Sequence, residues 1–546
     1  STAFQAFGFS LLYLPIPRSY YFFYFILLSI TTLITRFSYR ILHTMQNGIK
    51  KSAKHSRNTI VIGAGEAGNM IIKELKSSKY LNQKVVCVID DNPSKKGKYI
   101  HGIRIVGGRD MIQEAAKKYD AEEIILAIPS AGNKATRDIL RICNLTDCKL
   151  KILPGMYQLI NDDVGVSNLR EVSIEDLLGR DTIEIDMESV GQYVRNKRVL
   201  VTGGGGSIGS ELCRQIASHN PKLLIIFDIY ENNAYDIQQE LVRKYPNLKL
   251  EVLIGSVRNT SRIESVMEHY RPDVVFHAAA HKHVPLMEDS PNEAIKNNVF
   301  GTYKTARAAD KYGVKKFVLI STDKAVNPTN IMGASKRMCE MIVQSASING
   351  KVKYSATRFG NVLGSAGSVI PLFKRQIQNG GPITITDKRI IRYFMTIPEA
   401  SQLVLESGVL AHNGELLVLD MGKPIKILDL AENMIHLSGA QNIEIVETGL
   451  RPGEKLYEEL LVKTEELDKT ENDLIFREKD RPLSVEQIRE KLRMLKDVCD
   501  NGDDDQAREV LRKVVPTFKR PEEVNKEVGA EVEPEDNSLP QRRVRA

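Results

Sequence analysis

The sequence is poor in the residues that build several common kinds of site. Its 546 residues include only six cysteines, and no two of them form a C-x-x-C pair, so the sequence indicates neither a zinc knuckle nor a disulfide framework. We therefore expect a reduced protein that faces the cytosol. Two histidines, His281 and His283, lie close together, but no carboxylate or cysteine completes a site with them, and we predict no metal.

The chain also has little excess charge of either sign. The net charge of +7 is small for this length, the basic residues are spread out, and no arginine-rich run alternates with aromatic residues. This pattern does not predict nucleic-acid binding. The hydrophobic and charged fractions, 42% and 27%, are typical of globular proteins. The length allows about three to four domains.

One long apolar run stands out near the start of the chain. Residues 20–35 carry no charge and begin with tyrosines, which favour a membrane interface. A bilayer span takes about 20 apolar residues, so the flanks have to extend this run. Basic residues follow it, and the positive-inside rule places them on the cytoplasmic side: Arg36, Arg40, Lys50, Lys51, Lys54 and Arg57. We predict that residues 1–57 form a transmembrane segment of the inner (plasma) membrane and a basic linker, with the later domains in the cytoplasm.

Two alternatives to a membrane span stay open for this run. One is a signal peptide, although no small-residue cleavage site follows, and the other is a helix buried in a globular domain. Because the chain begins at Ser1, not at Met, and opens in apolar residues, we expect a trimmed or incomplete N-terminus.

A first α/β unit begins at residue 58. The strand NTIVIG leads into Gly63, Gly65 and Gly68, a helix follows, and the next strand ends in Asp90 and Asp91. Strand, glycine turn, helix, strand and acid in this order predict a Rossmann-like nucleotide-binding domain over residues 58–154, followed by a linker at 155–189. The motif indicates either a bound nucleotide or only a remnant of the fold.

A second glycine motif opens a larger α/β domain, predicted over residues 190–515. The strand RVLVTG precedes the turn, and a helix follows it. Glycines at this spacing let the backbone approach a pyrophosphate at the helix N-terminus. Asp228 ends the next strand, where a carboxylate accepts hydrogen bonds from ribose hydroxyls and repels a 2′-phosphate, so NAD is favoured over NADP. The turn residues expected to bind the cofactor are Gly203, Gly206, Ser207, Ile208 and Gly209.

Later strand ends should line the same crevice. Ser256 and Val257 follow one strand, and the small residues Ala278, Ala279 and Ala280 end another. In an open parallel sheet the ligand binds at the carboxyl ends of the strands, so we expect these residues to contact the cofactor. The alternative for the alanines is tight packing between a helix and a strand. The fold class is thus α/β, with two tandem Rossmann-like, doubly wound parallel-sheet domains after the transmembrane segment. Residues 516–546 have few large apolar groups and should be disordered.

A further strand, KKFVLIST, ends in Thr322, Asp323 and Lys324, and Lys336 opens the helix beyond it. A carboxyl group beside an amine at a strand end supplies an acid and a base within one crevice. Here the second domain resembles an extended short-chain dehydrogenase/reductase. More narrowly, it resembles the membrane-bound nucleotide-sugar 4,6-dehydratases of polysaccharide and capsule biosynthesis. The resemblance is carried by TGGGGSIGSEL, HAAAHKHVPLME, STDKAVNPTNIMGASKR, RFGNVLGSAGSVIP and GLRPGEKLYEEL, over about 250 residues.

The resemblance implies a demanding reaction. NAD⁺ removes hydride from C4 of the hexose, water leaves across C5–C6, and the hydride returns to C6. By the resemblance Lys324 is the base at C5, Asp323 the acid at the C6 hydroxyl, Lys336 a ligand of the nicotinamide ribose and Thr322 a partner of the C4 oxygen. A lysine base has to be neutral, and we expect burial or nearby positive charge to make it so.

Met332 departs from the pattern of the larger family, which has a tyrosine base at this position. Methionine accepts no proton, and the acceptor for the C4 proton is then Asp323 or a water held by Thr322. The long membrane-bound dehydratases share this methionine, which favours a single base and retention at C5. The alternative is an inactive site. The residues expected to bind substrate by the resemblance are Lys282, His283, Met332, Arg358, Asn361, Arg392, Arg451 and Glu454, although the charged ones among them are also compatible with ordinary ion pairs.

The sequence therefore predicts 4,6-dehydration of a UDP-sugar, taken to be UDP-N-acetylglucosamine, by a homo-oligomer that uses NAD. The alternatives are a dehydratase that inverts C5, a C4 epimerase, and a membrane-tethered NAD-binding regulator without turnover.

Overall fold

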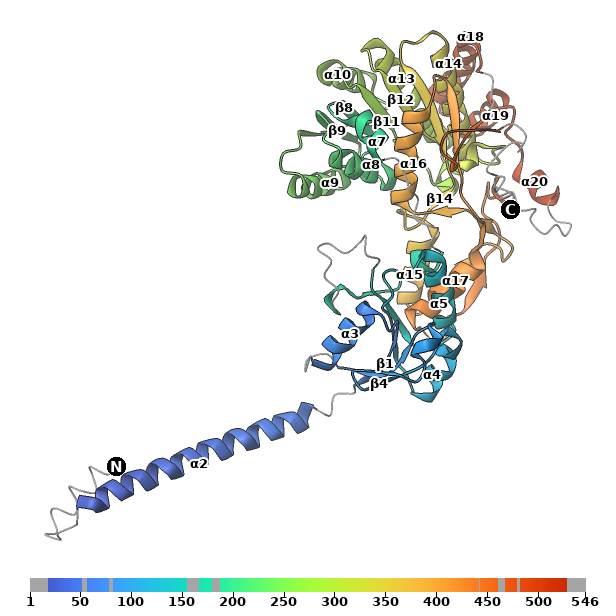
Figure 1. The fold of residues 1–546 in the computed structure, drawn as a ribbon. Helices are drawn as coiled ribbons and strands as arrows, with labels where there is room; N and C mark the ends of the chain where they lie inside the picture. The colour runs from blue at the N-terminus through green and yellow to red at the C-terminus, as the bar shows by residue number, and fades with distance from the viewer. Residues whose placement is uncertain are drawn as a thin grey trace. The chain divides into compact units, whose positions relative to one another are not determined.

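The computed structural model describes residues 18–51, 56–77, 82–154, 166–178, 187–440, 442–459, 467–478 and 482–527. The chain divides into two compact units (Figure 1). Unit 1 comprises Ser1–Ser130 and Leu150–Glu171, and unit 2 comprises Ala131–Lys149 and Val172–Ala546.

Helix α2 (Arg18–Lys51) contains the apolar run of residues 20–35. None of the helices formed by the described residues is both long enough and apolar enough to cross a membrane, so the predicted transmembrane segment is not supported. The predicted plasma-membrane location is tested by nothing in the fold and stays a prediction.

Unit 1 is built on a seven-stranded sheet in the order β3-β4-β2-β1-β5-β6-β7. Strand β1 pairs in parallel with β2 and β5, and the apolar residues of β1, β2 and β5 pack against α3 around Val61, Ile71 and Val88. The sheet extends to β7, beyond residue 154. The elements are β1 (Arg57–Ile62), α3 (Glu66–Ser77), β2 (Gln83–Ile89), β3 (Tyr99–Ile100), β4 (Ile103–Gly107), α4 (Ile112–Lys118), β5 (Glu123–Leu126), β6 (Lys149–Ile152) and β7 (Arg170–Glu171).

Unit 2 is built on a nine-stranded sheet in the order β10-β9-β8-β11-β12-β13-β18-β22-β21. The seven strands from β10 to β18 run parallel, and β22 and β21 add an antiparallel edge. The strands are β8 (Arg198–Thr202), β9 (Leu223–Asp228), β10 (Leu250–Ile254), β11 (Val274–His277), β12 (Lys316–Ile320), β13 (Lys353–Arg358), β18 (Glu415–Leu419), β21 (Leu467–Lys469) and β22 (Ile475–Glu478).

Alternate residues of these strands form two separate apolar cores. Val199 and Val201 of β8 pack on the face covered by α7, α8 and α16, whereas Leu200 packs on the face covered by α10, α13 and α14 (Figure 1). This alternation follows from the two-residue period of a strand and gives the doubly wound arrangement. The covering helices are α7 (Met187–Val194), α8 (Ser207–Ser218), α9 (Glu231–Lys244), α10 (Thr260–Tyr270), α13 (Gly301–Lys311), α14 (Ile331–Asn349) and α16 (Ile397–Leu410). The predicted α/β class with Rossmann-like parallel sheets is confirmed.

Shorter elements complete unit 2. Three small sheets pair β14 with β17, β15 with β20 and β16 with β19. The elements are α5 (Asn133–Cys143), α6 (Ile174–Leu178), α11 (Val284–Glu288), α12 (Pro291–Ala294), η5 (Ile295–Phe300), η6 (Asp323–Ala325), β14 (Asn361–Val362), α15 (Val369–Gln378), β15 (Ile383–Ile385), β16 (Ile391–Arg392), β17 (Phe394–Met395), β19 (Ile425–Lys426), α17 (Ile427–Ser438) and β20 (Ile445–Glu447).

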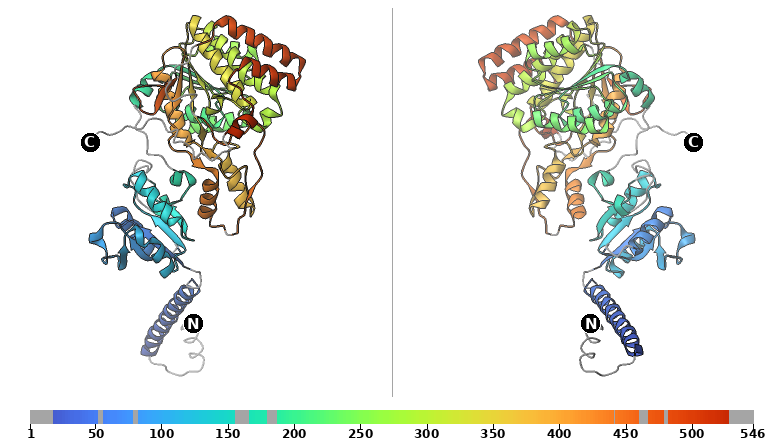
Figure 2. Two further views of the ribbon diagram at one scale, coloured as in Figure 1. Left: turned by 90° about the vertical axis from the view of Figure 1, so that its right-hand side faces the viewer. Right: turned by 90° about the vertical axis from the view of Figure 1, so that its left-hand side faces the viewer.

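The C-terminal region of unit 2 differs from the disordered tail expected from residue 516. Helices α18 (Val485–Asn501) and α19 (Asp504–Val514) pack against α14, and α20 (Pro521–Glu527) follows them (Figure 2). The physical reason is apolar burial, since Val515 and Phe518 lie in the same cluster as α14 and α18. Residues 528–546, the rest of the expected tail, lie outside the described residues.

All six cysteines are buried, and none forms a disulfide. Cys87 lies in unit 1, Cys213 and Cys339 lie in the cores of unit 2, and Cys499 lies on α18. Burial raises the pKa of the Cys87 thiol to about 12. The prediction of a reduced protein is compatible with this arrangement.

Candidate active site

The glycine-rich turn of unit 2 lies between β8 and α8, beside the point where the strand order reverses. Gly203 has a φ of 69°, and a Cβ atom there would come within 2.7 Å of the Ala279 amide nitrogen. A Cβ atom on Gly209 would come within 2.0 Å of the Gly203 carbonyl oxygen. The turn therefore requires these glycines for its own packing, and it leaves the N-terminus of α8 accessible to an anion in the way such turns do.

Two neighbours fix the rest of this turn. Gly206 is the N-cap of α8, and the Ser207 hydroxyl accepts a hydrogen bond from the Ala366 amide at 3.2 Å. Ile208 packs against the apolar core on the α8 side of the sheet. The loop around Ala366 thus lies against the turn, a contact that the sequence did not predict.

Asp228 ends β9 next to the glycine turn. One carboxylate oxygen accepts a hydrogen bond from the Gly205 amide and the other from the Tyr230 amide, both at 2.8 Å. The acid is thus held at the edge of the turn, as the sequence predicts.

The other predicted cofactor residues follow neighbouring strands. Ser256 accepts a hydrogen bond from the Arg258 amide, and Val257 is buried next to Gly301. Ala278, Ala279 and Ala280 continue from β11 and are partly buried. The backbone of Ala278 and Ala279 lies directly against Gly203, so packing also accounts for small residues here.

A histidine that the sequence analysis missed stands just before these alanines. The two ring nitrogens of His277 contact Thr202 Oγ1 at 2.7 Å and Thr302 Oγ1 at 3.0 Å. Burial, together with the charge of Lys336, lowers the pKa of His277 to about 3, so the ring is neutral. The ring links β8, β11 and α13.

Thr322, Asp323 and Lys324 lie together at the carboxyl end of β12. Thr322 caps the short helix η6, and its hydroxyl donates to Asp323 Oδ1 at 2.9 Å. Lys324 Nζ donates to the same oxygen at 3.0 Å. The Asp323 side chain is 0% exposed, and its Oδ2 has no hydrogen-bond partner among the described residues. Burial raises the pKa of Asp323, and this effect outweighs the opposing attraction of Lys324.

Lys324 lies between three acceptors. Its Nζ is 3.0 Å from Asp323 Oδ1, 3.2 Å from Asn361 Oδ1 and 3.5 Å from Glu458 Oε1. Burial by itself lowers the pKa of Lys324, but the two carboxylates outweigh burial and leave the pKa raised. The expectation of a lysine kept neutral by burial or nearby positive charge is therefore wrong for this site, because Asp323 and Glu458 outweigh both burial and the charge of Arg392.

Glu458 is a second site residue that the sequence analysis missed. It is buried, and its Oε1 lies 3.6 Å from Arg392 Nε as well as 3.5 Å from Lys324 Nζ. Burial raises the pKa of Glu458, but Lys324 and Arg392 outweigh it and lower the pKa, so the group is ionised. The only signal in the sequence was its place four residues after Glu454 in the motif RPGEKLYEEL.

Lys336 comes to the same strand end from α14. Its Nζ is buried and donates to the carbonyl oxygen of Ile320 at 2.6 Å. Burial lowers the pKa of Lys336. Met332, one turn earlier on α14, is 4% exposed and packs in an apolar cluster with Ile331 and Ala334.

Comparison with known proteins fits this geometry. Residues 199–480 match a family described as polysaccharide biosynthesis protein, and residues 6–154 match one described as a CoA-binding domain. Over 426 residues the chain is 48% identical to the capsular polysaccharide biosynthesis protein CapD of Staphylococcus aureus, an alignment that covers 77% of this chain and 70% of CapD. The chain belongs to the polysaccharide biosynthesis protein family.

Two other relatives carry names that describe a reaction. A UDP-N-acetylglucosamine 4,6-dehydratase (inverting) of Campylobacter jejuni is 33% identical over 315 residues, which cover 55% of this chain and 90% of that protein. A UDP-glucose 4-epimerase of Rickettsia bellii is 37% identical over 285 residues, which cover 51% of this chain and 81% of that protein.

In this member of the polysaccharide biosynthesis protein family, four of the predicted substrate residues are connected to Lys324, one directly and three through a series of contacts that begins at Glu458. Asn361 contacts Lys324 directly. Arg392 is buried and donates to the carbonyl oxygens of Lys455 and Leu456, and its Nη2 lies 3.5 Å from Glu454. Arg451, which is largely exposed, pairs with Glu454 at 3.2 Å. Glu454 therefore links Arg392 of β16 to Arg451 of its own loop in a chain of three charges.

The remaining predicted substrate residues are placed differently. Arg358 is 1% exposed and forms buried ion pairs with Glu340 and Glu478, so the structure does not bring it to the others. Lys282 and His283 lie just before α11 and each exposes much of its surface to solvent. The charged end of each side chain is nevertheless partly shielded from water, and this lowers the pKa of both groups. The His283 ring lies against Gly367, whose φ is 71°.

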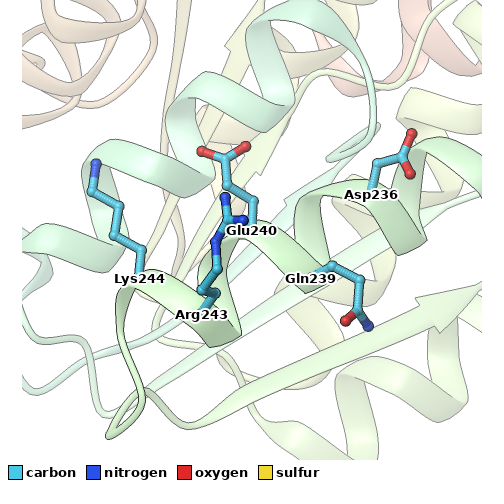
Figure 3. Close-up of a pocket in the computed structure, with 5 residues that line it drawn as sticks. All are labelled: Asp236, Gln239, Glu240, Arg243 and Lys244. Carbon is cyan, nitrogen blue, oxygen red and sulfur yellow. The ribbon is translucent and has the colours of Figure 1, made fainter. Parts of the chain in front are cut away.

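One surface depression of this family member lies away from these residues. It is lined by side chains of α9 alone: Asp236, Gln239, Glu240, Arg243 and Lys244 (Figure 3). Glu240 already pairs with Arg214 at 2.8 Å. The depression holds no element of the site at the end of β12.

Proposed function

We propose that unit 2 binds NAD⁺ and removes water from a UDP-sugar, with UDP-N-acetylglucosamine as the substrate and a UDP-4-keto-6-deoxy sugar as the product. The observation that carries the proposal is the buried pair of Asp323 and Lys324, 3.0 Å apart at the end of β12. A dehydration needs an acid and a base within reach of neighbouring carbons, and an adjacent carboxyl and amine supply them. Membership of the polysaccharide biosynthesis family and the dehydratase relative support the same reaction.

The residues around the glycine turn fit NAD⁺. Gly203, Gly206 and Gly209 would let the pyrophosphate approach the N-terminus of α8, and Asp228 would accept from the adenosine ribose. Lys336 would hold the nicotinamide ribose. When bound, the nicotinamide takes up the hydride that leaves C4 and returns it to C6.

The protons then pass through three side chains. Asp323 accepts the proton of the C4 hydroxyl when that carbon is oxidised. Lys324 gives a proton to Glu458 at 3.5 Å, a transfer that runs against the raised pKa of Lys324 and the lowered pKa of Glu458 and that the positive charge of bound NAD⁺ would favour. The neutral Lys324 then removes the proton from C5, which the 4-ketone has made acidic. Asp323 gives its proton to the C6 hydroxyl, the C6–O bond breaks, water leaves and a C5–C6 double bond forms.

The last step returns the hydride to C6 and restores the protonation state of each side chain. As hydride reaches C6, Lys324 gives its proton back to C5, and Glu458 returns the remaining proton to Lys324. Each side chain ends in the state in which it began, and the proton lost with water is the one that came from the C4 hydroxyl. Thr322, whose hydroxyl lies beside Asp323 Oδ1 at 2.9 Å, orients the C4 oxygen.

We infer retention at C5. Met332 is buried in an apolar cluster and offers no proton, so Lys324 is the group that both removes and restores the C5 proton. NMR of fresh product checks this inference, because an inverted C5 signal at early times would contradict it. The dehydratase of Campylobacter jejuni is named as inverting, and a comparison of the two products under one protocol is the sharpest control.

A C4 epimerase is the second candidate, because one relative is named UDP-glucose 4-epimerase. Mass spectrometry separates the two reactions. The purified protein is incubated with UDP-N-acetylglucosamine, UDP-glucose and dTDP-glucose, and the products are examined for loss of water. A sugar that keeps its mass while NMR shows an inverted C4 identifies an epimerase, and no conversion of any sugar contradicts both proposals. We expect NAD⁺, not NADP⁺, to copurify.

A further inference from the structure

The C-terminal segment of unit 2 returns to the loops that carry the site. We call residues Val515–Asn525 the C-terminal strap. Val515 and Phe518 anchor its first part, being 0% and 7% exposed in the cluster formed with α14 and α18. The Lys519 amide then donates to the Pro328 carbonyl at 2.9 Å. Pro328 lies in the segment between Lys324 and α14, so the strap touches the catalytic segment itself.

The strap ends on the loop formed by residues 451–459. Asn525, on α20, accepts a hydrogen bond from the Leu456 amide at 3.2 Å and donates one to the Glu454 carbonyl at 3.0 Å. An asparagine side chain that satisfies a backbone donor and a backbone acceptor fixes the local path of the chain.

The same loop is held on its other side by the site. Arg392 donates to the carbonyl oxygens of Lys455 and Leu456, at 2.8 and 3.0 Å, and Lys455 Nζ donates to the Val326 carbonyl at 3.2 Å. Glu458, two residues beyond Leu456, lies 3.5 Å from Lys324. The loop therefore lies between Arg392 and Asn525, and its backbone forms hydrogen bonds with the side chains of both residues.

We propose that the C-terminal strap holds the 451–459 loop in place for the nucleotide part of the substrate, with Asn525 as a positioning residue. The proposal rests on the proposed function, since Arg451 and Glu454 on this loop are the groups expected to bind the nucleotide. Loss of the two Asn525 hydrogen bonds would leave the loop to be ordered by the substrate, at the expense of affinity.

The test compares three variants of the full chain. Asn525→Ala removes both hydrogen bonds, Asn525→Asp keeps an acceptor for the Leu456 amide, and Glu522→Ala changes an exposed residue of the same helix as the matched control. We expect Asn525→Ala to raise KM for UDP-N-acetylglucosamine about 10-fold with a smaller change in kcat, Asn525→Asp to lie between, and Glu522→Ala to match the wild type.

Hydrogen exchange gives a readout that does not depend on turnover. The Leu456 amide should exchange faster in Asn525→Ala than in Glu522→Ala, with an unchanged Tm. If neither KM nor Leu456 exchange differs between these variants, the proposal is overturned. If exchange rises while KM stays the same, the part that concerns the substrate is overturned. If the wild type converts no sugar, the proposed function fails, and the exchange rates still decide whether the strap holds the loop.

Discussion

The two units share a glycine-rich turn and surround it differently. In each unit an aspartate at the end of the second strand accepts a hydrogen bond from an amide of the turn, Asp90 from Ala64 at 2.7 Å and Asp228 from Gly205 at 2.8 Å. In each, the third glycine lies directly against the carbonyl oxygen of the first. A Cβ atom added to Gly68 would come within 1.8 Å of that oxygen, and one added to Gly209 within 2.0 Å. The shared part is a requirement of the turn itself.

The differences lie around the turn. In unit 1, Lys95 pairs with Asp90 at 3.0 Å and donates to the Ala64 carbonyl at 3.1 Å, which neutralises the acid and fills the space beside it. A second backbone amide is common to both units, since Asp90 accepts one from Asn92 at 2.9 Å and Asp228 accepts one from Tyr230 at 2.8 Å. At the register position where unit 2 pairs Thr202 with His277, unit 1 pairs Ile62 with Leu126. A glycine turn therefore specifies the fold, and the polar groups at later strand ends specify chemistry.

The largest expected effect separates the units by catalysis. Lys324→Met and Asp323→Asn should each lower kcat at least about 10²-fold, the usual loss when a general base or acid is removed. Asp90→Asn and Lys95→Met, the matched changes in unit 1, should leave kcat unchanged. The measurement is product formation from UDP-N-acetylglucosamine by variants shown to be folded by circular dichroism. A near-normal rate in either unit 2 variant contradicts the assignment.

The next effect tests the shared turn. Gly209→Ala and Gly68→Ala should each destabilise their own unit by about 1–3 kcal/mol, because the new methyl group meets a backbone oxygen. Gly65→Ala is the control, since a Cβ there has nothing within 4 Å. Urea unfolding gives the free energies, and only Gly209→Ala should also lose bound NAD⁺. Equal stabilities for Gly65→Ala and Gly68→Ala would show that the turn relaxes.

The third effect concerns the polar pair that only unit 2 has at this register. His277 has a pKa of about 3 in the folded state, whereas an unfolded histidine titrates near pH 6.5. Below pH 6.5 the unfolded chain binds the additional proton, so stability falls as pH falls from 6.5 towards 3, by about 1.4 kcal/mol per unit from this group. Carboxylates add slopes of their own. The quantity to measure is therefore the difference in unfolding free energy between wild type and His277→Gln at pH 7, 6 and 5, and parallel curves would contradict the prediction.

The smallest effect concerns the two aspartates. Asp228→Asn should weaken NAD⁺ binding about 10-fold and reduce the discrimination against NADP⁺, because a charge that repels a 2′-phosphate is lost. Asp90→Asn should change neither affinity, since Lys95 already neutralises that acid. Calorimetric titration with both dinucleotides checks this, and unchanged discrimination in Asp228→Asn would show that selection lies elsewhere.

Short sequence patterns predict those features of the molecule that depend on neighbouring residues in the chain. Strand alternation, the two glycine turns, the acids after the second strands and the cluster of Thr322, Asp323 and Lys324 all follow from short stretches of sequence. The proximity of Glu458 to Lys324 does not, because it depends on a loop far along the chain packing back on β12. Without that contact the sequence predicts a lowered pKa for Lys324, whereas its two carboxylate neighbours raise it.

Other residues were misjudged for a related reason. Arg358 ends a strand whose position in the sequence predicts a residue of the site. In the structure it instead forms buried ion pairs with two glutamates that are distant in the sequence. Val515 and Phe518 are too few to predict an ordered segment from composition, but a ready apolar surface on α14 and α18 buries them.

The buried cysteines can report local opening of the folded protein. A thiol-specific reagent reacts with the thiolate, which burial both shields and disfavours, so labelling counts the moments when the region around each cysteine opens. Cys87 then reports on unit 1, Cys213 on the glycine-turn side of the unit 2 sheet, and Cys499 on the helix that anchors the C-terminal strap. Identifying labelled cysteines by mass spectrometry would rank the opening of these regions without any engineered probe.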